Sequence, residues 1–349
     1  MNSVLPIQQG SITGITGLEK RPVYFLRLNG AAQPNLVVKG DARNGSHPGI
    51  TDAEALVSIK WSSKLMKNVN NTLVNTKILT APEFAVFQQA AQATFGNGSR
   101  QRGFLTQPFK WVKMPMVPGL SDAEFYNDGN DVETRRLKEV VPKLLDDAVW
   151  RDLGRVLAVD IFAGNSDRFD VATGDWVNKG NLMFLDGGAT AVIGLDTFDP
   201  NSQDQGNLAN RGGFEAMRTL TDAARRDTFA LACTRSVGSE LQRAATAKLL
   251  GRFTLRVPGL NDAVIAFDVE NLGTLYERYA PLLAQGIAAG AAALRAYLQG
   301  KQQQYAPQPS WQNANASQAQ RRIIMGGNRT VQPKQLPAGV RQRMAYLGW

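Results

Sequence analysis

The spacing of hydrophobic and polar positions changes about a third of the way along the chain. Before that point, short runs of β-branched and aromatic residues lie between Gly and Pro residues, which is typical of strands. Extended segments are predicted at residues 10–30, 35–41, 75–84 and 108–117, and two more short strands within 181–198. Apolar residues three or four positions apart predict helices at 51–69, within 133–163 and over most of the chain beyond residue 207.

This order of elements predicts an α+β fold with two lobes and a cleft between them. A β-rich lobe is expected at residues 1–118, because Pro118 and Gly119 end the last strand of the first group. A larger helical lobe is expected at residues 119–300. Residues 301–349 are expected to form a basic tail that begins with a stretch rich in Gln, Asn and Pro.

Cysteine and histidine are nearly absent, and this narrows the chemistry available to the chain. Cys233 is the single cysteine and His47 the single histidine. An intramolecular disulfide and a thiolate zinc site are therefore excluded. A Ser-His-Asp triad could use only His47 as its base. Chemistry must rely on carboxylates, Lys, Arg and Asn, together with a hard metal ion. No apolar run long enough to span a membrane and no secretory signal is found, so a cytosolic location is predicted.

The net charge of +9 arises at the end of the chain. From residue 278 onwards there are nine Lys and Arg residues and no Asp or Glu. We expect this basic segment to contact an acidic partner protein or anionic lipid, with Trp311, Tyr346 and Trp349 as anchors, and no specific nucleic acid. Two alternatives are a tail that only keeps the protein soluble and a short helix at 338–349 that buries its aromatic rings against the helical lobe.

Phosphoryl transfer from ATP needs a defined set of groups, and the chain offers a candidate for each in the required order. Gly14 and Gly17 lie in the first predicted hairpin, where a glycine-rich backbone can cover phosphates. Lys39 ends the apolar strand NLVV, and Glu54 follows on the next predicted helix, so the two can form an ion pair that aims the ammonium at the nucleotide. The alternatives are an ordinary turn, a surface Lys, and a Glu that only favours the first turn of its helix.

The segment KWVKMPMVPG, residues 110–119, is the candidate for contact with the adenine ring. Its backbone groups would bind the adenine edge, with Met114 or Met116 against the ring, a role that suits the adaptable Met side chain. A strand of the hydrophobic core is an equal alternative.

Three polar residues in the middle of the chain each adjoin an apolar segment. Asp167 follows the long predicted helix, Asn181 starts the run NLMF, and Asp196 ends the run AVIGLD. An acid that orients the acceptor hydroxyl, followed by an Asn and a second acid that hold metal, is what a magnesium–nucleotide site needs. Asp-capped turns without chemistry are the alternative for each residue taken singly.

The runs DIFAGNSDRF, NLMF and IGLD resemble the catalytic and metal-binding segment of the atypical kinases. That clan includes the phosphatidylinositol 3/4-kinases, the HipA-type bacterial kinases and the secretory-pathway kinases. The resemblance covers residues 10–200 and implies a protein-kinase-like fold with a small β-rich N-lobe and a larger helical C-lobe. It implies that Asp167 is the catalytic Asp, that Asn181 and Asp196 hold Mg²⁺ or Mn²⁺, and that Lys39 and Glu54 bind and position ATP.

The chain departs from the pattern of that clan at three points. Phe169 stands where many relatives have His, and Thr197-Phe198 follows the second acid where Phe-Gly is usual. Asp167 and Asn181 are 14 positions apart, more than the usual handful, so DVATGDWVNKG is interpreted as an insertion. Asn178 or Asp175 then remains an alternative metal-side residue.

The sequence thus predicts an ATP- and Mg²⁺-dependent kinase that phosphorylates a hydroxyl, with a protein Ser or Thr favoured over a phosphoinositide. Residues 197–214 contain only Arg211 beside Asp199 and Asp204, a poor set for a crowded anionic headgroup. The alternatives are a phosphoinositide kinase, a nucleotidyl transferase with the same fold, and an inactive binding module. By analogy with compact atypical kinases, a bacterial effector acting in a host cytosol is a further possibility.

Overall fold

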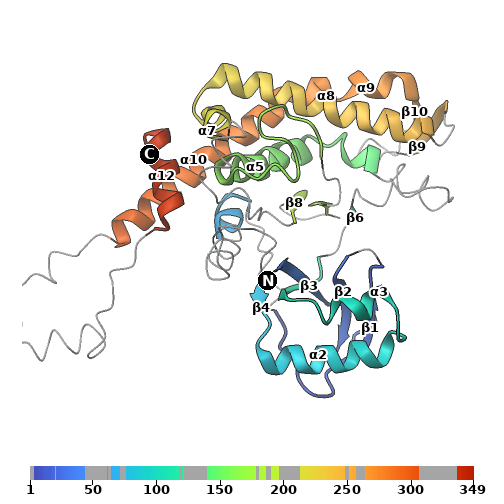
Figure 1. The fold of residues 1–349 in the computed structure, drawn as a ribbon. Helices are drawn as coiled ribbons and strands as arrows, with labels where there is room; N and C mark the ends of the chain where they lie inside the picture. Colours follow the sequence, from blue (N-terminus) through green and yellow to red (C-terminus); the bar gives the residue numbers. More distant parts are fainter. Residues whose placement is uncertain are drawn as a thin grey trace, which may run out of the picture.

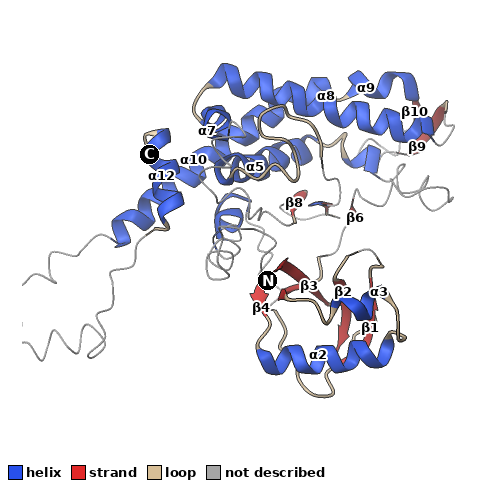
Figure 2. Ribbon diagram, viewed as in Figure 1, coloured by secondary structure: helices blue, strands red, loops and turns tan. Residues whose placement is uncertain are grey.

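The computed structural model describes the chain in segments, each folded into recognisable secondary structure (Figures 1 and 2). The described residues are 4–19, 21–43, 61, 64–70, 76–117, 120–121, 140–177, 181–185, 190–195, 213–247, 251–256, 264–305 and 336–349. A small antiparallel sheet precedes a larger helical part, so the predicted α+β class is confirmed at this coarse level.

The first part of the chain forms a five-stranded antiparallel sheet with strand order β1-β2-β3-β5-β4. Its strands are β1 (Ile12–Gly17), β2 (Val23–Leu28), β3 (Leu36–Arg43), β4 (Lys77–Ile78) and β5 (Phe109–Pro115). The helices α2 (Ala81–Thr94) and α3 (Arg100–Phe104) accompany the sheet. In Figure 1, α2 lies on the face of this sheet that points away from the helical part.

Aromatic packing holds α2 on the sheet. The ring of Tyr24 on β2 meets Phe87 of α2 edge-on at 5.1 Å, and Trp111 on β5 stacks on Phe84 at 5.5 Å. The helix begins after Thr80, whose hydroxyl accepts a hydrogen bond from the Glu83 backbone while the Glu83 carboxylate accepts one from the Thr80 backbone. This capping box satisfies donors that the first turn of a helix leaves open.

The helical part contains several long helices and two small sheets. Its helices are α5 (Asp147–Ala163), α7 (Gly213–Met217), α8 (Ala223–Ala247), α9 (Leu272–Leu275), α10 (Ala280–Tyr305) and α12 (Ala338–Leu347), with 3-10 turns η4 (Arg218–Leu220), η5 (Val269–Asn271) and η6 (Glu277–Tyr279). Its strands are β6 (Leu120–Ser121), β7 (Leu182–Phe184) and β8 (Val192–Gly194), which form one sheet, and the hairpin β9 (Arg252–Arg256) and β10 (Val264–Asp268). The described residues beyond 207 are mostly helical, as predicted, and the β9–β10 hairpin is an addition that the sequence analysis did not predict.

Helix α5 is buried along nearly its whole length and forms the centre of the helical part. The predicted helix within 133–163 begins at Asp147, because the Asp146 carboxylate accepts a hydrogen bond from the Ala148 backbone at 2.8 Å and caps the first turn. Helix α10 crosses α5 very closely. A Cβ atom added at Gly286 would lie 2.2 Å from the Arg151 carbonyl oxygen, so only glycine allows this approach.

The hydrophobic side chains gather into two separate clusters. One cluster lies between the sheet and α2, and the other surrounds α5. Residues 64–70, which fall inside the predicted 1–118 lobe, pack with the helical cluster, and Asn70 Nδ2 donates to the Val192 carbonyl on β8 at 2.7 Å. Helix α10 likewise runs past the predicted boundary at residue 300.

The end of the chain packs against the helical part. The ring of Trp349 stacks on Phe162 of α5 with centroids 5.7 Å apart, and Tyr346 of α12 contacts Phe214 of α7 at 5.2 Å. Both rings therefore contact the helical part, as the folded-back alternative expects, although Tyr346 stays exposed. Contact of this segment with an outside partner remains a prediction. Trp311 lies outside the described residues.

Across the part of the chain that the structure describes, no helix is both long enough and apolar enough to cross a membrane.

Candidate functional site

The loop after α5 exposes one acid between buried polar neighbours. Helix α5 ends at Gly164, whose φ of 71° is the left-handed conformation that glycine adopts without strain. Asn165 is fully buried, and its Nδ2 donates to Asp160 Oδ1 at 3.0 Å while its Oδ1 accepts from the Asp167 backbone at 3.2 Å. The Asp167 side chain is exposed. The buried Asn165 side chain thus holds the backbone of Asp167 in place, and the Asp167 carboxylate lies at the surface.

Asn181 lies beside Asp167 although 14 positions separate them in the sequence. Its Nδ2 donates to Asp167 Oδ2 at 2.7 Å, and its side chain is almost completely buried at the start of β7. Two of the three predicted catalytic and metal residues are therefore in direct contact.

Residues 168–177, the described part of the chain between Asp167 and Asn181, form a tight hairpin. The rings of Phe169 and Trp176 stack at 5.9 Å across a β-bridge, and the Asp170 backbone donates to the Asp175 carbonyl at 2.8 Å. The Trp176 backbone donates to Ser236 Oγ on α8 at 2.8 Å, which ties the hairpin to the helical part. The Asp175 carboxylate accepts from the Thr173 hydroxyl within the same turn. The described part of the predicted insertion, residues 170–177, therefore packs toward α8, and Asp175 takes no part in the Asp167–Asn181 contact. Asn178 lies outside the described residues.

A buried ion pair lies directly behind the exposed acid. Arg168 and Asp160 are both fully buried, and the guanidinium donates to the Asp160 carboxylate. Burial raises the pKa of Asp160, against the opposing effect of Arg168. Sequence reasoning passed over this pair; its signal was the acid in the apolar run VDIF eight positions before Arg168.

Asp196, the third predicted residue, lies outside the described residues, but its neighbour Leu195 does not. The Leu195 backbone donates to the Asn181 carbonyl at 2.8 Å. At the other end of β8, the Asp152 carboxylate of α5 accepts from the Ala191 backbone at 2.7 Å. The strand that leads to Asp196 is therefore held at both ends.

Lys39 lies in β3, half-buried, on the opposite face of the sheet from α2. It pairs in register with Val23 and Val112, whereas its neighbour Val38 shares the α2 face with Tyr24. Glu54, the predicted partner of Lys39, lies outside the described residues.

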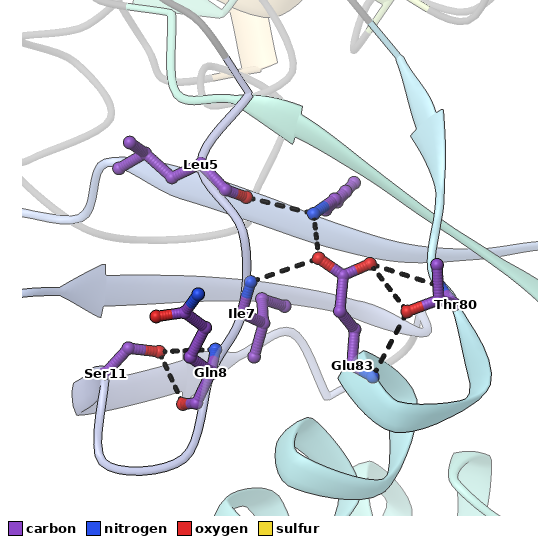
Figure 3. Close-up of polar contacts among 7 residues, drawn as sticks. Leu5, Ile7, Gln8, Ser11, Thr80 and Glu83 are labelled. Carbon is purple, nitrogen blue, oxygen red and sulfur yellow. Dashed lines mark hydrogen bonds and ion pairs between the residues drawn. The ribbon is translucent and has the colours of Figure 1, made fainter.

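A different Lys–Glu pair is visible on the α2 side of the sheet. Lys113 of β5 donates to the Glu83 carboxylate and to the Leu5 carbonyl, and Glu83 also accepts from the Ile7 backbone at 3.1 Å (Figure 3). Burial opposes ionisation of Glu83, but the hydrogen bonds from Lys113, Thr80 and Ile7 hold its pKa below the usual value. The Lys113–Glu83 pair thus binds the backbone of residues 5–7 to the sheet and to α2. The capping-box spacing of TAPE was the signal in the sequence for Glu83.

The two candidate phosphate-loop glycines lie within β1 and have packing reasons of their own. A Cβ atom at Gly14 would lie 2.4 Å from the Arg27 guanidinium, and one at Gly17 would lie 3.0 Å from the Tyr24 ring. Close packing of the β1–β2 hairpin accounts for both glycines, in line with the structural alternative.

The candidate adenine-binding segment is split between a strand and its end. Met114 is half-buried in β5 and pairs in register with Val37 of β3. Met116 follows the strand, and its backbone N–H donates to the Asn35 carbonyl at 3.1 Å. That N–H is therefore already used inside the protein.

The donor atoms near Asp167 fit a hard cation by their chemistry. Asn181 turns Nδ2 toward Asp167. The Asn181 amide oxygen and the Asp167 carboxylate are oxygen atoms of the kind that Mg²⁺ prefers as ligands. Within the described ranges, no three His, Cys, Asp or Glu side chains come together as a metal-binding group. A complete site would need a further oxygen, for which Asp196 is the sequence candidate.

Comparisons of the chain with protein-family descriptions, with curated proteins and with solved structures found no match.

Proposed function

We propose that this chain is an ATP- and Mg²⁺-dependent kinase that transfers the γ-phosphoryl group to a hydroxyl, most readily that of a protein Ser or Thr. The observation that carries the proposal is the 2.7 Å hydrogen bond from Asn181 Nδ2 to Asp167 Oδ2, between two residues that lie 14 positions apart in the sequence. Kinases need an acid and an Asn in such proximity, one for the acceptor and one for the metal.

In this mechanism the acceptor hydroxyl attacks the γ-phosphorus of ATP. A bond forms between the hydroxyl oxygen and phosphorus, the bond from phosphorus to the β–γ bridging oxygen breaks, and ADP leaves. Asp167, exposed and fixed by Asn165, orients the hydroxyl and accepts its proton. Asn181, with Asp196, would hold Mg²⁺, which neutralises charge on the phosphates when bound.

The remaining parts of the proposed site are less complete. Two separate hydrophobic clusters support a two-lobed arrangement, with the sheet as N-lobe and the helices as C-lobe. Lys39 lies on the sheet face opposite α2, which suits a residue that reaches phosphates between the lobes. Glu54 is proposed as its partner, and Met114 as the apolar contact for adenine.

The acceptor and the place of action are also part of the proposal. A protein hydroxyl is favoured because the sequence after Asp196 is poor in cations, whereas a phosphoinositide headgroup needs several. The basic residues of 301–349 would attract an acidic partner or anionic lipid. We propose a cytosolic site of action, with delivery into a host cytosol as the alternative.

The proposal is tested by the variant Asp167→Asn in reactions with labelled ATP, supplied with a cell lysate or with phosphatidylinositol vesicles. We expect transfer to fall by about 10² to 10⁴-fold, because the proton acceptor is lost, while ATP binding measured by calorimetry stays unchanged. Asp175→Asn is the matched control, since that carboxylate bonds only within the hairpin turn among the contacts seen. Equal transfer by wild type and Asp167→Asn would contradict the proposal.

Mass spectrometry of the modified target decides between the two reactions that the site would serve. A phosphate adds far less mass than a nucleotidyl group, so one spectrum distinguishes a kinase from a nucleotidyl transferase. A wild-type protein that binds no Mg²⁺–ATP would favour an inactive binding module.

A further inference from the structure

Arg168 contacts three segments of the candidate site with three different nitrogen atoms. Its Nη1 donates to Asp160 on α5, its Nε donates to the Asn181 carbonyl at 3.0 Å, and its Nη2 donates to the Leu195 carbonyl after β8. The side chain is fully buried, so it does not touch a substrate. One guanidinium thus joins the end of the central helix, the start of β7 and the end of β8.

The surrounding residues are shaped for a guanidinium. A planar guanidinium presents several donors in a fixed geometry, whereas a Lys ammonium is a compact point charge. A Cβ atom added at Gly194 would lie 2.6 Å from Nη2 and 2.8 Å from Cζ of Arg168, so glycine is needed where β8 passes the side chain. The glycine of the run IGLD, Gly194, therefore leaves room for the Arg168 guanidinium.

We propose that Arg168 is the positioning residue of this site, which fixes Asn181 beside Asp167 by holding the start of β7 against the end of β8. The inference rests on the proposed function, because Asn181 is a candidate metal ligand. The Asn181 and Leu195 carbonyls are held by the same guanidinium, and Asp160 holds that guanidinium in turn. Outer residues of this kind orient ligands without contacting the metal.

The variant Arg168→Lys tests this inference, because it keeps the charge beside Asp160 but loses the geometry of the fork. We measure binding of Mn²⁺ in the presence of ADP by electron paramagnetic resonance, and the Mg²⁺ concentration that gives half the maximal rate of phosphate transfer. Loss of an outer residue weakens metal binding by about 10 to 100-fold, and we expect a shift of that size in both measurements. The affinity for ATP in EDTA should not change, and a merely structural role would not produce this separation.

Arg155→Lys is the matched control on the same helix. Arg155 pairs with Asp152 at 3.1 Å and its side chain is 41% exposed, so its replacement should leave both metal measurements unchanged. Gly194→Ala is the second test variant, since its methyl group must displace the Arg168 guanidinium without removing it. If circular dichroism shows that Arg168→Lys does not fold, Gly194→Ala decides the question.

The outcomes separate this inference from the proposed function. Wild-type metal binding in folded Gly194→Ala, and in Arg168→Lys where that variant folds, overturns the positioning role, while loss of transfer in Asp167→Asn would still support the kinase. A wild-type protein that neither binds Mn²⁺–ADP nor transfers phosphate overturns both.

Discussion

Replacing Arg168 by Met removes the positive charge from a buried ion pair and leaves Asp160 alone in the core. Both side chains are fully buried, so neither charge is screened by water. Breaking a buried pair by removing one partner costs about 3–5 kcal/mol, because the remaining charge is uncompensated. The Asn181 and Leu195 carbonyls also lose their Arg168 donor, so we expect about 4 kcal/mol at pH 8, within that range.

The cost should depend on pH, with a sign set by the buried carboxyl. Burial raises the pKa of Asp160 in the folded protein, and loss of Arg168 must raise it further. Between the unfolded pKa, about 3.9, and the higher folded pKa, the folded state binds the proton more readily. Stability therefore falls as pH rises through this window, by up to about 1.4 kcal/mol per pH unit. Arg168→Met should be destabilised less at pH 5 than at pH 8.

Urea denaturation at the two pH values, followed by tryptophan fluorescence, measures the free energy of unfolding. Arg151→Met is the control, because Arg151 forms an exposed pair with Asp147 at 3.5 Å. Such pairs contribute about 0–1 kcal/mol, so this variant should stay close to wild type at both pH values. The reasoning is refuted if Arg168→Met costs less than about 1 kcal/mol at pH 8, or the same amount at both pH values.

Two further predictions concern the packing that holds α5. Gly286→Ala should lower the free energy of unfolding by about 2 kcal/mol, because its methyl group meets the Arg151 carbonyl. Gly300→Ala on the same helix is the control: a Cβ atom there has nothing within 4 Å, so this variant should raise the free energy of unfolding by about 0.5–1 kcal/mol. Equal urea midpoints for the two variants would contradict the close α5–α10 crossing. Deleting residues 336–349 should lower the melting temperature and increase the binding of a dye that reports exposed apolar surface, because Phe162 loses the stacked ring of Trp349. An unchanged melting temperature would show that the core does not need this segment.

Local patterns in the sequence determined the class of the fold and several of its boundaries. Short runs of apolar, β-branched and aromatic residues bounded by Gly and Pro predicted the strands around Lys39 and Met114, because this signal needs only neighbouring residues. Gly164 ends α5, since a left-handed C-cap is a local property of the backbone. The Asp167–Asn181 pair was also a sequence candidate, because acid and amide chemistry follows from residue type.

Tertiary structure alone decided which residues meet. The sequence alone could not show that Asp167 and Asn181 are in contact, because 14 positions separate them. In the structure, the stacking of Phe169 on Trp176 and the contact of that hairpin with α8 let the two residues meet. The same holds for Arg168, whose three acceptors come from separate segments of the chain. Burial, and the pairing that it imposes on polar groups, depends on every element packed around a side chain, and no local pattern contains that information.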